Sequence, residues 1–405
     1  MKIALIGYEA NIKNRVGSNQ YAFELMKALY ELDQKNQYTV FLPTPPLSDL
    51  PPSKSNWQYR VVGPRKFWNL FGLPLALWQQ KPKPDVVFNP GHYCPLVFPA
   101  PLVVSIMDLG YLHYPEHFTK KIYWKLKFWT ALSIKRATHL LTISQSTKND
   151  IIKYYRVDSN KITVGYPGYD REKFKSPFGP SSGRGQNSKV KIEEVKKKYK
   201  IKGDYILSLS TLKPSKNIEG LLEAFKIVLS EETGDGSQER GEKNSKLRTQ
   251  NSCLAGRQVE LKLVIAGKKG WLFEKIFEKV KELGLKDKVI FTGFVEEKEV
   301  PALMAGAKVF VMPSFWEGFG IPVVEAMACG TPVVVSKTGS LPEIVGQAGV
   351  LIDPYNPEDI ALGIKKAMEE KNKLTARGLE QSCQFNWLNC AKEVIEVLND
   401  IGKSA

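Results

Sequence analysis

The stretch that decides the fold runs from Pro313 to Pro354 and reads PSFWEGFGIPVVEAMACGTPVVVSKTGSLPEIVGQAGVLIDP. One apolar run directly precedes it, at 309–312, and a second lies inside it, at 332–335; both are typical of buried strands. Between the two runs we expect a glycine-rich loop and a helix that begins near Ile321. A strand, a loop, a helix and a second strand in this order are the repeating unit of a parallel α/β sheet.

The expected loop and helix suit a phosphate group. A glycine-containing loop that leads into a helix presents free backbone N–H groups and the positive end of the helix dipole. Two carboxylates, Glu317 and Glu325, bracket this anion site with seven residues between them. A carboxylate beside a phosphate is unfavourable unless it has another task, and an ionised carboxylate accepts hydrogen bonds from sugar hydroxyls well. The pattern therefore favours a site for a sugar phosphate over two ordinary acids at a helix end.

Further motifs extend this pattern along most of the chain. They are G-S-N-Q-Y from Gly17, M-D-L-G-Y-L-H-Y-P-E from Met107, L-T-I-S-Q-S-T from Leu141, K-P-S-K-N from Lys213, V-I-A-G from Val264, F-T-G-F-V from Phe291 and F-N-W from Phe385. With the E-x7-E pair, their order resembles that of the retaining glycosyltransferases of family four, which use nucleotide-sugars and have the GT-B fold. The motifs are most similar to those of a mannosyltransferase-like branch. The resemblance implies transfer of mannose or a similar hexose, with retention of configuration, to a glycan or lipid-linked acceptor in polysaccharide or glycolipid biosynthesis.

Composition limits the class of protein. The chain has 405 residues, of which 43% are hydrophobic and 25% are charged, as expected for a folded protein of two domains. Its five scattered cysteines contain no C-x-x-C pair, which favours a reducing compartment and argues against a disulfide framework. The start of the chain is too short for a signal peptide, and prolines interrupt the uncharged run 89–107, so we expect no membrane span and a cytoplasmic protein.

The net charge of +16 indicates anionic partners. Because no nucleic-acid motif accompanies the charge, we expect phosphorylated substrates or anionic lipid and no nucleic acid. The donor substrate implied by the resemblance is a nucleotide-diphosphate sugar, GDP- or UDP-linked, and no further cofactor is expected.

Apolar runs alternate with amphipathic helical stretches in both halves of the chain. The strands that we expect lie at 3–6, 39–42, 85–88, 102–107, 140–143 and 162–164, and then at 205–209, 261–266, 289–292, 309–312, 332–335 and 350–352. This alternation predicts an α/β fold with two Rossmann-like parallel-sheet domains that face a central cleft. The chemistry is expected in that cleft, at the carboxyl ends of the strands.

The two halves define the expected domains. We expect an N-terminal Rossmann-like acceptor domain over 1–170, a linker over 171–200 and a nucleotide-sugar domain over 201–380. The polar stretch 231–258 interrupts the second domain as a flexible insertion without a catalytic role. The resemblance implies that a C-terminal helix, within 381–405, crosses back to the N-terminal domain.

Lys216 is the cation that we expect at the diphosphate. A lysine at the start of a helix is unfavourable for the helix dipole unless it faces a bound anion. The family often has Arg where this chain has Ser215, so Lys213 and Lys268 are the candidates to supply the missing positive contact. No D-x-D pair, which metal-dependent sugar transferases commonly use, occurs in the sequence. We therefore expect a metal-independent enzyme in which Lys216 and the helix end at Ile321 stabilise the leaving group.

The resemblance also implies the donor-binding residues. Glu325 would bind the ribose hydroxyls, and Glu317 would bind the transferred sugar as a catalytic residue together with Lys216. The remaining contacts to the donor would come from Phe319, Gly320, Ile321, Gly293, Phe294, Val295 and Thr211.

Two residues of the N-terminal half complete the expected site. Gly17 lies between a strand and a helix and could bring a backbone amide against the phosphate or the acceptor. Asp108 ends an apolar strand and would face the cleft as a third catalytic residue. The family frequently has His directly before this Asp; here it is Met107, so any role that needs an imidazole there is lost. The four histidines do not form a metal-spaced set; His139 is interpreted as structural, and His113 is the one to test.

The segment 119–129, TKKIYWKLKFW, combines four lysines with four aromatic residues at helical spacing. Such a helix suits an anionic membrane surface. A core-facing aromatic stripe with a solvated basic face explains the same pattern. The basic chain and the lipid-linked acceptors of similar enzymes favour peripheral attachment to the inner face of the membrane.

A transferase has three alternatives. A NAD-dependent oxidoreductase needs G-x-G-x-x-G after the first strand, and residues 7–11, G-Y-E-A-N, lack it. A catalytically silent sugar-nucleotide binder is disfavoured because Glu317, Glu325 and Lys216 are all present. A sugar-nucleotide epimerase of the same fold remains open; it would release free nucleotide and an epimerised sugar and form no glycoside.

Overall fold

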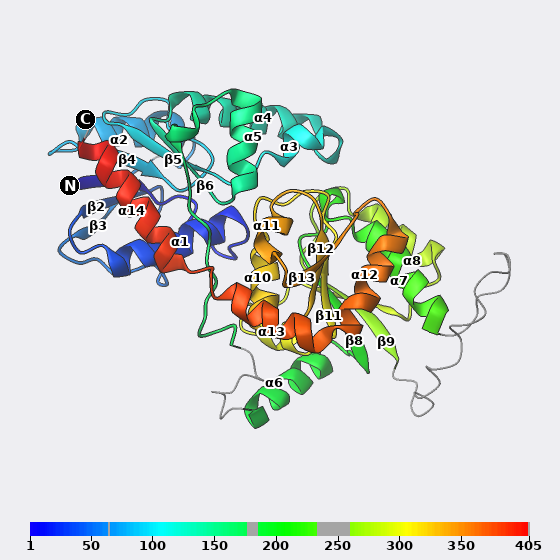
Figure 1. Ribbon diagram of the computed structural model, residues 1–405. Helices are drawn as coiled ribbons and strands as arrows, with labels where there is room; N and C mark the ends of the chain where they lie inside the picture. Colours follow the sequence, from blue (N-terminus) through cyan, green and yellow to red (C-terminus); the bar gives the residue numbers. More distant parts are fainter. Residues whose placement is uncertain (64, 176–184, 233–259, 404–405) are drawn as a thin grey trace. The chain divides into compact units, whose positions relative to one another are not determined.

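The computed structural model describes residues 1–63, 65–175, 185–232 and 260–403. The chain divides into two compact units, each built around a parallel sheet with helices against it (Figure 1). Unit 1 comprises residues 1–169, 317–321 and 384–405, and unit 2 comprises residues 170–316 and 322–383.

Unit 1 contains a seven-stranded sheet in the order β3-β2-β1-β4-β5-β6-β7, in which every neighbouring pair is parallel. The strands are β1 (Lys2–Ile6), β2 (Gln37–Leu42), β3 (Trp57–Val61), β4 (Val86–Asn89), β5 (Leu102–Ile106), β6 (His139–Thr142) and β7 (Ile162–Val164). The six strands expected for this half are present, with bounds shifted by at most two residues.

The strand β3 was not expected. It lies at the edge of the sheet and pairs only with β2. Its sequence, WQYRV, places Gln58 and Arg60 among apolar residues and leaves much of the strand accessible to solvent. An edge strand needs only one buried face, so it lacks the continuous apolar run by which the central strands are recognised.

The helices of unit 1 lie on both faces of its sheet. They are α1 (Ser18–Leu32), α2 (Leu73–Gln79), α3 (Gly110–His113), α4 (Lys120–Arg136), α5 (Gln145–Tyr155) and α14 (Trp387–Lys403), with shorter turns η1 (Trp68–Gly72), η2 (Pro115–His117) and η3 (Ser159–Lys161). The C-terminal helix α14 packs along α1 (Figure 1). Residues of α2, α4 and α5 share one apolar cluster with Ala4 and Ile6 of β1.

Unit 2 contains a six-stranded parallel sheet in the order β10-β9-β8-β11-β12-β13. The strands are β8 (Asp204–Leu209), β9 (Leu261–Ala266), β10 (Val289–Gly293), β11 (Val309–Met312), β12 (Val333–Ser336) and β13 (Gly349–Ile352). All six were expected, with bounds shifted by at most one residue. Buried runs such as VFVM in β11 and VVVS in β12 explain the accuracy, because a strand covered on both faces is apolar at every position.

The helices of unit 2 surround this sheet. They are α6 (Gly185–Lys198), α7 (Ile218–Glu232), α8 (Glu274–Glu282), α9 (Val300–Ala305), α10 (Ile321–Ala328), α11 (Leu341–Val345), α12 (Pro357–Glu369) and α13 (Lys371–Ser382), with the turn η4 (Pro214–Lys216). The expected linker, 171–200, lies partly outside the described residues, and most of its part from 185 onward forms α6. The expected insertion, 231–258, also lies outside them, except for two residues that end α7.

None of the helices in the described part of the chain combines the length and the apolar character that crossing a membrane requires.

Candidate functional site

The strand order of unit 2 reverses between β8 and β11. In an open parallel sheet, the loops that leave the carboxyl ends of two such strands run in opposite directions, and ligands bind in the crevice between them. The loop after β8 carries Thr211 and Lys216, and the loop after β11 carries Glu317 and leads into α10. The two loops singled out in the sequence therefore start side by side at the same edge of the sheet.

One hydrogen bond joins these two loops, and another ties the second of them to the loop after β12. The backbone N–H of Phe315 donates to the carbonyl of Ser215 over 3.0 Å. The hydroxyl of Thr338 donates to the carbonyl of Phe315 over 2.9 Å. Ser215, the residue that replaces the usual arginine, is buried, and its backbone carbonyl holds the loop after β11. Its neighbour Lys216 is half-buried at the end of the turn η4.

Asn217 fixes the turn that ends at Lys216. It adopts the left-handed conformation, with φ 52°, which Asn tolerates better than most residues. Its side chain donates from Nδ2 to the carbonyl of Pro354 over 2.6 Å and accepts at Oδ1 from the N–H of Gly220, near the start of α7. The backbone at Lys216 is therefore held by a buried residue, while the lysine side chain remains partly accessible.

The loops after β9 and β10 lie at the same edge of the sheet, on the side of the β8 loop away from β11. The N–H of Gly267 donates to the carbonyl of Gly293 over 2.8 Å, and the N–H of Leu212 donates to the carbonyl of Lys268 over 3.0 Å. A Cβ on Gly267 would lie 1.9 Å from the carbonyl oxygen of Ser210, so only glycine fits there. These contacts bring the loops after β8, β9 and β10 together, and two of these loops carry the predicted donor residues Thr211 and Gly293.

The predicted base-binding residues differ in exposure. Gly293 has φ 69° and ends β10, Phe294 is half exposed, and Val295 is buried. Lys268, one of the two candidates to supply the missing positive contact, is exposed in the loop after β9. The other candidate, Lys213, lies 5.1 Å from the ring centre of Trp271.

The helix α10 begins at Ile321, as predicted, and ends at Ala328, two residues before Gly330, where φ is 78°. Glu325 lies in its second turn and is half-buried. Burial, with a smaller contribution from the Glu325 carboxylate, raises the pKa of the Cys329 thiol, which keeps this thiol protonated.

The loop before α10 contains the other predicted donor contacts. Gly320 has φ 96°, which only glycine adopts readily, and Phe319 is buried. Glu317 is half-buried.

Unit 1 has its own reversal of strand order, between β1 and β4. Gly17 precedes α1 in the loop after β1, with φ 56° and open space where a Cβ would stand. Asp108 follows β5, and its Oδ1 accepts from the N–H of Gly110 over 2.9 Å. Both predicted residues therefore lie at the edge of the sheet where the strands end.

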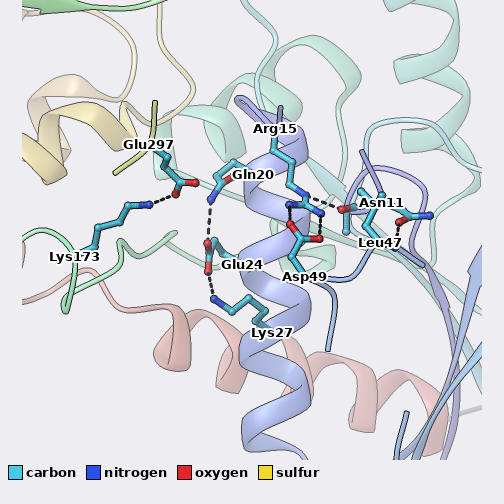
Figure 2. Close-up of polar contacts among 10 residues, drawn as sticks. Asn11, Arg15, Gln20, Glu24, Lys27, Leu47, Asp49, Lys173 and Glu297 are labelled. Carbon is cyan, nitrogen blue, oxygen red and sulfur yellow. Dashed lines mark hydrogen bonds and ion pairs between the residues drawn. The ribbon is translucent and has the colours of Figure 1, made fainter. Parts of the chain in front are cut away.

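The loop that carries Gly17 is tied down by polar contacts (Figure 2). Arg15 donates to both carboxylate oxygens of Asp49, at 2.6 and 3.0 Å, and to the carbonyl of Ala10 at 2.7 Å. The hydrogen bonds from the Arg15 guanidinium lower the pKa of the Asp49 carboxyl. Asn11 accepts from the N–H of Leu47 over 2.9 Å. This loop is thus fixed through side chains as well as through its own backbone.

Two residues that were not predicted, Glu9 and His92, also lie at this edge. The carboxylate of Glu9 accepts a short hydrogen bond from the Asn19 side chain, and burial raises its pKa while Lys125 opposes the shift. His92 lies with Nε2 3.4 Å from the carbonyl of Asp108, and burial lowers its pKa. The available signal was position, because each residue follows the carboxyl end of a strand at the reversal point.

The two remaining histidines singled out in the sequence, His139 and His113, both contact polar side chains. His139 contacts the Thr163 hydroxyl at 2.9 Å, consistent with a structural role. His113 lies 3.0 Å from both carboxylate oxygens of Asp150 on α5. This pair links α3 to α5, and the role of His113 stays a matter for the test named above. Within the described residues, His, Cys, Asp and Glu side chains form no group of three or more that could bind a metal ion.

Two family models match the chain. Glycosyltransferase Family 4 matches residues 16–173, and Glycosyl transferases group 1 matches residues 191–380. Because these two models together account for most of its length, the chain belongs to the glycosyltransferases that the two models describe.

Curated relatives of the chain include mannosyltransferases. O-antigen chain mannosyltransferase B of Escherichia coli is 28% identical over 342 residues, which are 83% of this chain and 78% of that protein. The serotype-specific mannosyltransferase WbdA of Escherichia coli is 30% identical over 300 residues, which are 73% of this chain but only 32% of WbdA. The chain therefore spans about a third of the length of WbdA.

Solved structures share the fold over nearly the whole chain. Anabaena HepE in complex with UDP and glucose has a TM-score of 0.69 at 19% identity, covering 99% of this chain and 100% of HepE. WaaG, a glycosyltransferase involved in lipopolysaccharide biosynthesis, has a TM-score of 0.68 at 15% identity, covering 98% of this chain and 99% of WaaG. The predicted fold, GT-B with two Rossmann-like units, is confirmed.

Proposed function

We propose that the chain transfers mannose or a similar hexose from a GDP- or UDP-linked donor to a glycan or lipid-linked acceptor, with retention of configuration and without a metal ion. The main support is the hydrogen bond between Phe315 and Ser215, which joins the Lys216 loop to the loop after β11 where the strand order reverses. The names of the mannosyltransferase relatives favour mannose and a role in polysaccharide or glycolipid biosynthesis.

The proposed donor contacts are those that the family resemblance implies. Glu325 would accept hydrogen bonds from the ribose hydroxyls, and Glu317 from hydroxyls of the transferred hexose. Backbone N–H groups of 319–321 would contact the sugar and the diphosphate at the start of α10. The base would lie against 293–295, and Thr211 would complete the phosphate side.

The leaving group determines the proposed mechanism. Breaking the anomeric C–O bond leaves positive charge on the sugar and adds negative charge to the departing diphosphate. Lys216 and the N-terminus of α10 would stabilise that charge without a metal. The acceptor hydroxyl would attack from the face that the diphosphate leaves and pass its proton to a phosphate oxygen. No carboxylate is assigned as a nucleophile, unlike the two-carboxylate arrangement of many glycosidases.

Unit 1 would bind the acceptor. Asp108 and the backbone amide at Gly17 are the groups that we assign to this task. Positioning of the acceptor hydroxyl would then supply much of the rate acceleration.

The first prediction concerns Lys216. Lys216→Ala should lower turnover by about a hundredfold or more, because one partner of the developing diphosphate charge is lost. Lys226→Ala, an exposed lysine on α7, is the matched control and should keep full activity. The turnover is measured by transfer of radiolabelled hexose from the donor to an acceptor. When no acceptor is known, the slow hydrolysis of the donor, which releases hexose to water, is measured instead.

The same assay tests the metal-free mechanism. Activity should be unchanged in EDTA. Loss of transfer in EDTA with recovery on adding magnesium would show that the mechanism is wrong. Free nucleotide with an epimerised sugar, and no glycoside, would identify an epimerase instead.

We also propose peripheral attachment to an anionic membrane through α4, on the cytoplasmic face. Tyr123 of α4 packs against the core, whereas Trp124 and Phe128 are each 62% exposed. The exposed lysines of this helix include Lys120 and Lys121. One face of α4 thus packs on the core, as one interpretation of its sequence predicts. The outward face carries aromatic and basic side chains, as the membrane interpretation requires.

A further inference from the structure

The segment formed by η1 and α2 presents apolar side chains on two opposite sides. Trp68, Leu73 and Leu77 are buried and belong to the core cluster of unit 1. On the other side, four large apolar residues are exposed at intervals of four, four and three: Phe67 (58%), Phe71 (68%), Leu75 (60%) and Trp78 (48%). This spacing places them in one stripe along the helical segment. We call these four residues the outer stripe.

An apolar stripe of this kind needs a partner. Single exposed apolar residues are normal, but a contiguous row of two phenylalanines, a leucine and a tryptophan marks an interaction surface. The core of unit 1 cannot be that partner, because the buried side of the same segment already faces it.

The charges around the outer stripe indicate the kind of partner. Residues 61–84 contain no Asp or Glu. Arg65 and Lys66 precede the stripe, Lys81 and Lys83 follow it, and all four are exposed. The Lys66 ammonium lies 5.5 Å from the ring centre of Phe67. Cations thus border the apolar row at both ends, and within this span no acid neutralises them.

The outer stripe lies on the same side of the sheet as α4. Leu73 and Leu77 of α2 share one core cluster with Ile134 of α4, and this cluster covers the face of β1 that carries Ala4 and Ile6. Alternate strand residues point to opposite faces, so both helices cover this one face. Their outward sides therefore belong to the same outer layer of unit 1, which carries the outer stripe, Trp124 and Phe128.

We propose that the outer stripe inserts into the interface of an anionic phospholipid bilayer. Phenylalanine, leucine and tryptophan bury their side chains at the boundary between headgroups and acyl chains, and the flanking cations contact the lipid phosphates. The proposal rests on the proposed peripheral attachment and deepens it, because it assigns the apolar part of the binding to η1 and α2 rather than to α4 alone.

A second copy of the chain is a poorer partner for the same surface. A symmetric contact through the outer stripe would bring Arg65, Lys66, Lys81 and Lys83 close to the same residues of the other copy. Like charges placed together oppose such an association. An anionic bilayer instead attracts all four.

The test is co-sedimentation with vesicles of phosphatidylcholine alone and of phosphatidylcholine with phosphatidylglycerol, at low and high salt. The full chain is compared with Phe71→Ser/Leu75→Ser/Trp78→Ser. A matched pair of single variants, Leu75→Ser and Leu362→Ser, replaces leucines of equal exposure (60% and 61%) on α2 and on α12. The variant Lys120/Lys121/Lys125/Lys127→Gln removes the charge of α4. Circular dichroism verifies folding, and light scattering measures oligomeric state.

Binding of the wild type to anionic vesicles should persist in part at high salt, since apolar insertion is not screened. The triple variant should bind at least about tenfold more weakly, and Leu75→Ser should weaken binding whereas Leu362→Ser should not. The α4 variant should lose binding mainly at low salt.

Equal vesicle binding by the folded triple variant and the wild type would overturn the proposal. So would a change from dimer to monomer in the triple variant without a change in vesicle binding, which would identify a self-association surface. Hexose release from the donor, measured without vesicles, separates this proposal from the proposed function. If the wild type releases hexose but does not bind vesicles, only the proposed membrane-binding surface is refuted. If it binds vesicles but releases no hexose, only the proposed transferase activity is refuted.

Discussion

Glu9 is a half-buried acid at the edge of the unit 1 sheet, and its burial shifts its pKa. Its folded pKa lies above the usual value of 4.5 because burial disfavours the carboxylate. The native state therefore holds this proton more tightly than the unfolded state. As a result, stability falls as the pH rises from 4.5 through the folded pKa, and it stays lower at neutral pH.

The second prediction follows from this sign. Glu9→Gln should be more stable than the wild type at pH 8, because the buried charge is gone while the amide oxygen still accepts from Asn19. The difference should shrink as the pH falls through the folded pKa and should vanish below 4.5. Urea unfolding at a series of pH values measures it, with Glu31→Gln, an exposed acid of α1, as the control. A Glu9→Gln variant less stable than the wild type at pH 8 would contradict the assignment.

Individual donor residues could be predicted from the sequence where a motif spans a strand, a loop and a helix. Lys216 and Glu325 were placed correctly in their local elements for this reason. Glu9 and His92 could not be found in that way, because neither belongs to a motif. Their burial and their partners, Asn19 and the carbonyl of Asp108, depend on which strands are neighbours in the sheet.

At the scale of elements, the loops after β8, β9 and β10 act as one structure. Gly267 is central to it, because φ is 141° and any Cβ would collide with the carbonyl of Ser210. Relief of this clash would separate the backbone of Thr211 from that of Gly293, and both belong to the proposed donor site.

The third prediction is that Gly267→Ala destabilises the protein by about 2 kcal/mol or more, as expected for strain together with a backbone clash. Gly284→Ala is the control: φ is 69°, but nothing lies within 4 Å of the new Cβ, so about 1 kcal/mol is expected from the backbone conformation alone. Urea unfolding compares the two variants. Equal effects of both substitutions would show that the packing of these loops is not tight.

Deeply buried strands were easier to predict from the sequence than partly exposed ones. The central strands of both sheets are apolar at nearly every position, whereas β3 alternates and was missed. The start of α10 was found from Pro322 and the preceding glycines. The order of the strands required the structure, because pairing between distant segments leaves no local pattern.

At the scale of the whole molecule, each unit has a reversal of strand order, and its candidate residues follow the carboxyl ends of strands at or next to that reversal. In unit 2 this edge carries the Lys216 loop and the first residues after β11; in unit 1 it carries Glu9, Gly17 and Asp108. The net charge of +16 suits the proposed anionic donor, and the basic outer layer of unit 1 suits the proposed lipid surface. The family relationship explains why the same arrangement was recognisable from short motifs.

The measurement that tests the central claim most directly is calorimetric titration of GDP and UDP into the chain in EDTA. One of the two nucleotides should bind the wild type and Glu369→Ala, an exposed acid on α12, with equal affinity. Glu325→Ala should bind it more weakly by roughly 1–3 kcal/mol, or about fivefold to 150-fold, because the ribose hydroxyls lose their acceptor. If neither nucleotide binds without metal, or if Glu325→Ala binds as the wild type does, the proposed donor site is wrong.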